Sequence, residues 1–274
     1  MTRSCRLIAE IGSNWLGQPD LALRHIDAAA AAGADGVKFQ LFRAADLYRE
    51  PPPGLERFEL PLAQLVPLAA HAHGHKMTFS VTPYTPALAT LLADTVDTVK
   101  ISAYDLTYDA LLEAVAALAL PVVLSTAMAT IAEIRHALDV LGPPFERITL
   151  LHGVAAYPAS PTDSHLARLL ILSRHWPMCP IGLSDHSLGT VVAVSAVTLG
   201  AQHIEKHFTL VSGDILRYSP DAPHSASPQQ FAALVGAIER GESTSADFEM
   251  IVGGPPVDGP LPCELPLYKT CRRT

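Results

Sequence analysis

The sequence has few of the features that mark secreted, membrane or nucleic-acid-binding proteins. It has only four cysteines in 274 residues, with no CxxC pair or other metal-binding spacing, which predicts a reduced, cytoplasmic protein. No apolar run reaches the length of a membrane span, and the one near the N-terminus is too short for a signal peptide. The net charge of −8 argues against nucleic acid or an anionic membrane as the main partner. Local cations must therefore bind any anionic substrate.

The sequence also lacks the glycine-rich GxGxxG that usually follows the first strand of a doubly wound sheet. Here the first strand-like run continues into Gly12-Ser13-Asn14-Trp15. Eight strand-like runs alternate with alanine- and leucine-rich helical stretches over about 240 residues, which predicts an α/β fold of the (β/α)8 TIM-barrel type. The predicted strands are 6–11, 36–40, 77–81, 98–102, 121–124, 148–152, 180–183 and 202–206. The predicted helices include 19–32, 61–73, 107–118, 130–141 and 188–199.

The alternating pattern stops near residue 240. We therefore predict a barrel domain over residues 1–240 and an extended C-terminal tail over 241–274. The tail contains Gly-Gly-Pro-Pro, few periodic apolar residues and a basic end. Such a tail could pack on a neighbouring subunit, and a homodimer is the candidate assembly.

Polar residues cluster at the predicted carboxyl ends of the strands, where TIM barrels place their chemistry. Lys38 and Lys100, with several hydroxyl groups at the same mouth, suit a phosphate or a carboxylate. A single lysine at a strand end is more often a solvated rim charge, so the prediction depends on the whole set. The set is Glu10, Lys38, Gln40, Thr82, Lys100, Ser102, Ser125, Thr126, His152, Ser184, His186, Glu205 and His207.

Two of the twelve histidines predict a metal site. His186 lies in GLSDHSLG and His207 in IEKHFT, and each follows an apolar run that reads as a strand. Because neighbouring parallel strands end at the same mouth, the two imidazoles suit Mn²⁺, Mg²⁺ or Zn²⁺, with water and substrate oxygens as further ligands. His203 is expected one layer deeper. Glu205 has two open roles, which are to orient His207 or to pair with a buried lysine.

These motifs resemble the catalytic barrel of the sialic acid synthases, which are N-acetylneuraminate synthase and its pseudaminate and legionaminate relatives. The resemblance covers about residues 6–240. The matching stretches are 8–14, 31–40, 82–84, 99–101, 124–130, 151–152, 157–158, the two histidine motifs and 219–221.

The resemblance implies a Mn²⁺- or Mg²⁺-dependent condensation of phosphoenolpyruvate with an aldehyde acceptor. In known members the acceptor is an N-acylated amino sugar such as N-acetylmannosamine, and the products are a 2-keto-3-deoxy acid and phosphate. The resemblance implies metal ligation by His186 and His207. It implies catalytic roles for Glu10, Lys38, Lys100 and Asp105. It implies substrate contacts for Gln40, Thr82, Tyr84, Ser125, Tyr157, Ser184 and Asp221.

The chain departs from the family pattern where substrates are expected to bind. The family usually has Lys-Ile-x-Ser-Gly-Glu at the fourth strand. In this chain Ala103, Tyr104 and Asp105 take the places of the serine, glycine and glutamate. After the sixth strand, Ala155 replaces a polar residue of the family pattern. Tyr104 and Trp15 are expected to narrow the mouth. We expect the protein to lack the antifreeze-like domain that usually follows the barrel, although residues 262–273 resemble the linker to it. We therefore expect an acceptor other than N-acetylmannosamine.

Two alternatives stay open at this point. A metal-dependent keto-acid aldolase or lyase with a changed donor would explain the polar groups lost at Ala103 and Ala155. A non-catalytic sugar- or metal-binding relative would bind metal without turnover, but the retained residues Glu10, Lys38 and Lys100 argue against it.

Overall fold

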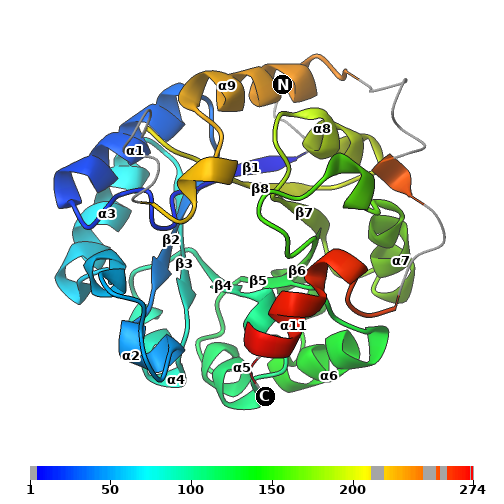
Figure 1. The fold of residues 1–274 in the computed structure, drawn as a ribbon, viewed down its shortest axis with the longest axis horizontal. Helices are drawn as coiled ribbons and strands as arrows, with labels where there is room; N and C mark the ends of the chain where they lie inside the picture. The colour runs from blue at the N-terminus through cyan, green and yellow to red at the C-terminus, as the bar shows by residue number, and fades with distance from the viewer. Residues whose placement is uncertain (1–4, 211–218, 243–250, 254–257, 272, 274) are drawn as a thin grey trace.

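Eight parallel strands close into a barrel, as Figure 1 shows. A computed structural model describes residues 5–210, 219–242, 251–253, 258–271 and 273. Each strand pairs with the next along the chain, and the last pairs with the first. The TIM-barrel prediction is confirmed, and each predicted strand ends within two residues of an observed one. The strands are β1 (Arg6–Glu10), β2 (Gly36–Leu41), β3 (Thr78–Pro83), β4 (Thr98–Ile101), β5 (Val122–Ser125), β6 (Ile148–Gly153), β7 (Ile181–Asp185) and β8 (His203–His207).

Helices surround the barrel and cover the outward faces of the strands (Figure 1). All five predicted helices are present, and α7 and α9 complete the ring. Two helices begin with a capping box, formed by Thr130 with Glu133 in α6 and by Ser227 with Gln230 in α9. The helices are α1 (Pro19–Ala31), α2 (Ala44–Leu47), α3 (Leu62–Gly74), α4 (Pro86–Ala89), α5 (Asp109–Ala116), α6 (Ile131–Leu141), α7 (Ala167–His175), α8 (Val191–Thr198) and α9 (Pro228–Glu239). In the described part of the chain, no helix is both long enough and apolar enough to cross a membrane.

The period-two alternation of the strands separates the core from the site. In β2, Val37 and Phe39 are fully buried in the hydrophobic core, while Lys38 and Gln40 face the interior of the barrel. Gly182 in β7 allows a close approach, because a Cβ there would collide with the backbone oxygen of His203. The barrel thus presents alternate polar residues at the carboxyl ends of its strands.

The C-terminal segment differs from the extended tail that the sequence predicts. A 3₁₀ turn, η8 (Pro262–Glu264), leads into helix α11 (Leu265–Cys271), which lies back against the barrel (Figure 1). The buried Glu264 carboxylate accepts hydrogen bonds from the backbone N–H groups of Ala155 and Leu261, both at 2.8 Å. These bonds satisfy a buried carboxylate and thereby anchor the segment. The parts of the predicted tail at 243–250, 254–257, 272 and 274 lie outside the described residues.

Candidate active site

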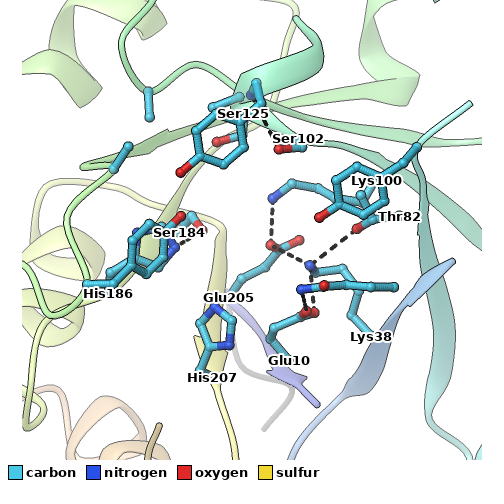
Figure 2. Close-up of a pocket in the computed structure, with 17 residues that line it drawn as sticks. Glu10, Lys38, Thr82, Lys100, Ser102, Ser125, Ser184, His186, Glu205 and His207 are labelled. Atoms are coloured by element: carbon cyan, nitrogen blue, oxygen red, sulfur yellow. Dashed lines mark hydrogen bonds and ion pairs between the residues drawn. The ribbon is translucent and has the colours of Figure 1, made fainter. Parts of the chain in front are cut away.

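One cavity, partly open to solvent, lies at the carboxyl ends of the strands (Figure 2). All the residues to which the resemblance gives a catalytic, substrate or metal role line it, except Asp105 and Asp221, and of the predicted strand-end set only Thr126 and His152 do not. The lining residues are Glu10, Lys38, Gln40, Thr82, Tyr84, Lys100, Ser102, Ala103, Tyr104, Ser125, Ala127, Ala155, Tyr157, Ser184, His186, Glu205 and His207.

Two lysines and two glutamates form a buried ion network at the floor of this cavity (Figure 2). Lys38 Nζ lies 2.6 Å from Glu10 Oε2 and 3.6 Å from Glu205 Oε2. Lys100 Nζ lies 2.6 Å from the same Glu205 oxygen. Of the two roles considered for Glu205, the structure therefore shows the pairing with buried lysines. The formal charges of the four groups balance, so the network can exist without a ligand.

Neighbouring polar side chains support this network, and His203 lies one layer deeper, as expected. His203 Nε2 lies 3.6 Å from Glu205 Oε1, on the side away from the mouth. Gln40 Nε2 donates to Glu10 Oε1 at 3.0 Å, and Lys38 donates to Thr82 Oγ1 at 3.5 Å. These bonds hold the Glu10 carboxylate and the Lys38 ammonium in defined positions.

Burial and neighbouring charges shift the pKa values of the network in different directions. Burial alone would raise the pKa of Glu205, but Lys100 and Lys38 hold it well below its usual range. Burial opposes the charged form of Lys38, yet Glu10 and Glu205 leave its pKa raised. Burial raises the pKa of Glu10 and lowers that of Lys100, and their ion-pair partners only partly counter it. Glu10 and Lys100 are therefore the two groups whose ionisation the site opposes.

The two predicted metal-binding histidines lie side by side in the cavity (Figure 2), with ring centroids 5.7 Å apart. His186 Nδ1 donates to the backbone carbonyl of Val154 at 2.7 Å, which leaves Nε2 facing the cavity near Ser184 Oγ at 3.3 Å. Burial lowers the pKa of His186 to about 4 and holds that of His207 well below its usual range. Both rings are therefore neutral near pH 7, which is the form that binds metal.

A third histidine, which the sequence analysis did not single out, joins these two. His224 ends a 3₁₀ turn, η7 (Ala222–His224), and its ring centroid lies 4.5 Å from that of His207. One signal for it was present in the sequence, since it follows Asp221 by three residues.

Asp221 lies beside His224 at the rim rather than in the cavity wall. Its Oδ2 accepts hydrogen bonds from the Ser13 backbone N–H at 2.7 Å and the Ser13 hydroxyl at 2.8 Å. This contact requires Gly12, because Gly12 has φ of +52° and a Cβ there would collide with the Asp221 carboxylate. Asp221 is thus held in place with Oδ1 still turned toward His224.

Asp105, for which the resemblance implies a catalytic role, is paired with Arg273 of the C-terminal segment. Asp105 is fully buried in η3 (Ala103–Asp105), outside the cavity wall, and its Oδ1 lies 2.6 Å from Arg273 Nε. Burial raises its pKa to about 6, although Arg273 opposes this shift. The local fold turns this carboxylate toward the C-terminal segment rather than toward a substrate.

Two other expectations fail for similar reasons. His152 does not line the cavity, because its Nε2 donates to the Ser164 backbone carbonyl at 2.6 Å, and burial lowers its pKa to about 3. Trp15 lies in the hydrophobic core and does not narrow the mouth, whereas Tyr104 does line the cavity.

The two alanines that replace polar residues of the family pattern lie in an apolar environment. Ala103 and Ala155 form a small apolar cluster with Ala127 and Met128. Leu267 and Tyr268 of α11 pack against this cluster. The loss of polar groups there accompanies an apolar contact with the C-terminal helix, so it does not by itself indicate a damaged donor site.

Comparison with known proteins agrees with this geometry. A family model described as the NeuB family matches residues 25–249. The chain is 35% identical over 257 residues to the spore coat polysaccharide biosynthesis protein SpsE of Bacillus subtilis, covering 86% of this chain and 67% of that protein. It is 33% identical over 262 residues to the N,N'-diacetyllegionaminic acid synthase of Campylobacter jejuni, covering 88% and 77%. The crystal structure of the N-acetylneuraminic acid synthetase of Leptospira borgpetersenii, in complex with citrate, superposes with a TM-score of 0.81 at 33% identity, covering 86% and 83%.

Proposed function

The chain belongs to the NeuB family of phosphoenolpyruvate-condensing sugar-acid synthases, and we propose that its acceptor is a sugar-like aldehyde other than N-acetylmannosamine. The reaction joins C3 of phosphoenolpyruvate to the aldehyde carbon while a water molecule adds to C2. Cleavage of the C2–O bond then releases phosphate and leaves a 2-keto-3-deoxy acid. This places the enzyme in carbohydrate biosynthesis.

The observation that carries the donor assignment is the pair of buried lysines facing the cavity. Lys38 and Lys100 are less than a tenth exposed, and Glu205 lies between them. An incoming phosphate or carboxylate can share these ammonium groups with Glu205, at short range and away from bulk water. Nearby hydroxyl groups complete the proposed donor site, and they belong to Thr82, Ser125 and Ser184.

Glu10 is the proposed acid-base group. Burial raises its pKa, which favours the protonated carboxyl that an acid catalyst needs, and Lys38 and Gln40 fix its orientation. The lysines would stabilise the negative charge that develops as the donor reacts.

His186 and His207 fit a divalent cation because both are neutral and His207 Nδ1 is buried without a hydrogen-bond partner among the described residues. We propose Mn²⁺ or Mg²⁺, which when bound would polarise the aldehyde oxygen of the acceptor.

The proposed acceptor region is the outer part of the cavity. Gln40, Tyr84 and Tyr157 line it, and Asp221 lies at its rim. The relatives act on different acceptors, since their names include legionaminic, pseudaminic and N-acetylneuraminate-9-phosphate synthases. Tyr104 and Ala155 change the size and polarity of this wall, which supports an altered acceptor.

Calorimetric titration of phosphoenolpyruvate with Mn²⁺ present, repeated after chelation, tests the donor. Micromolar binding that chelation weakens is the expected result. Mass spectrometry of products with a panel of amino-sugar aldehydes then identifies the acceptor. Product formation from unphosphorylated pyruvate would instead support the keto-acid lyase, and metal binding without turnover of any donor would support the non-catalytic relative. A cytoplasmic location and a homodimer stay predictions.

A further inference from the structure

Two buried imidazole nitrogens, one in the cavity wall and one beside it, have no hydrogen-bond partner in the described part of the chain. They are Nδ1 of His207 and Nε2 of His224. Both side chains are more than nine-tenths buried, with relative exposures of 8% and 4%. An unsatisfied buried polar atom costs about 1–3 kcal/mol. Two such atoms on neighbouring rings suit a ligand that both could bind.

The surroundings of these atoms indicate a cation. One ligand atom from each of His207, Asp221 and His224 lies within 4.8 Å of the others. Asp221 Oδ1 lies 3.9 Å from His224 Nε2, while its Oδ2 is held by Ser13. A transition-metal ion that binds about 2 Å from each ligand could join the three after a small closing movement.

We propose that His224 and Asp221, together with His207, bind the divalent metal of this enzyme, so that a third imidazole and a carboxylate extend the His186 and His207 pair. The inference deepens the proposed function, since it concerns the metal of the same site. Imidazole nitrogens together with one carboxylate suit Mn²⁺, Fe²⁺, Co²⁺ or Zn²⁺, whereas Mg²⁺ prefers oxygen ligands. The site should therefore select a transition metal over Mg²⁺.

His224 also has a purely structural reading. Its ring packs on Tyr157, with centroids 5.0 Å apart, and on His207. If packing is its whole role, replacing it will change thermal stability and leave metal affinity intact. Metal affinity is thus the measurement that separates the two roles.

The test uses the full chain, stripped of metal and free of phosphoenolpyruvate. Co²⁺ binding is followed by its absorption bands, and Zn²⁺ and Mg²⁺ binding by calorimetry. A second cluster on the surface, formed by Asp27, His71 and His75, could also bind Co²⁺. All proteins therefore carry His71→Gln and His75→Gln, which remove this background.

His224→Gln is compared with His136→Gln, an exposed histidine on α6 paired with Asp109. We expect His224→Gln to weaken Co²⁺ and Zn²⁺ binding at least 10-fold and His136→Gln to leave it unchanged. His224→Asn is the second variant, and thermal melting identifies any protein that is not folded. Co²⁺ affinity within twofold of the parent in a folded His224 variant, together with its loss in His186→Gln, would overturn the proposal.

The metal-binding test and the test of the proposed reaction can fail separately. Metal binding that depends on His224 in a protein that turns over no donor would refute the reaction and keep the site. Turnover of phosphoenolpyruvate together with unchanged metal affinity in His224→Gln would refute the site and keep the reaction.

Discussion

Replacing Lys100 with methionine tests the donor site most directly. The substitution keeps the length of the side chain and removes the ammonium that lies 2.6 Å from Glu205 Oε2. Both side chains are only 4% exposed, so water cannot substitute for the lost partner. Of its two lysine partners Glu205 then keeps Lys38, at 3.6 Å, and the network changes from a balanced charge to a net charge of −1.

The expected decrease in affinity for phosphoenolpyruvate has two causes. The donor loses one charge-assisted hydrogen bond, worth about 1.5–3 kcal/mol, and meets a Glu205 carboxylate that is less well neutralised. A total of about 2–4 kcal/mol corresponds to a roughly 30- to 1,000-fold weaker affinity for phosphoenolpyruvate. Breaking the buried pair should also lower the free energy of unfolding by about 3–5 kcal/mol.

Calorimetric titration of phosphoenolpyruvate with saturating Mn²⁺ measures the affinity, and urea unfolding measures the stability. Lys206→Met is the matched control, because Lys206 forms an equally short and buried pair with Asp185, at 2.6 Å, outside the cavity wall. It should lose comparable stability and keep its affinity for the donor. Lys100→Met binding within threefold of the wild type, or an equal loss in both variants, would refute the placement of Lys100 in the donor site.

Three further predictions concern the histidines and the C-terminal segment. His186→Ala or His207→Ala should abolish metal-dependent turnover while circular dichroism shows an intact fold, and full activity in both variants would refute their metal role. Burial lowers the pKa of His25 from 6.5 to about 4, so its contribution to stability is complete above pH 6.5 and falls by about 3 kcal/mol as the pH drops toward 4. His25→Gln should flatten the slope of urea-unfolding free energy against pH in this range, and an unchanged slope would contradict the assignment. Arg273→Ala removes the partner of Asp105 and should lower stability by about 1–3 kcal/mol and speed tryptic cleavage of the C-terminal helix; cleavage at the wild-type rate would show that this ion pair does not hold the segment.

The C-terminal segment also accounts for the departures from the family pattern that follow strands four and six. Ala103 and Ala155 suggest a donor site with missing polar groups when they are considered alone. In the fold they meet Leu267 and Tyr268, which lie more than 100 residues further along the chain. No local pattern in the sequence could show this contact.

The sequence by itself determined the barrel and most of its site. Period-two alternation and parallel strands are local and repetitive, so they bring Lys38, Lys100 and Glu205 to one mouth in any barrel with this register. Only the tertiary structure decided the contacts made by loops and by the C-terminal segment. Asp105 faces Arg273, and His224 joins His207. Such contacts depend on how irregular segments fold back on the barrel, and hydrophobic periodicity contains no information about that.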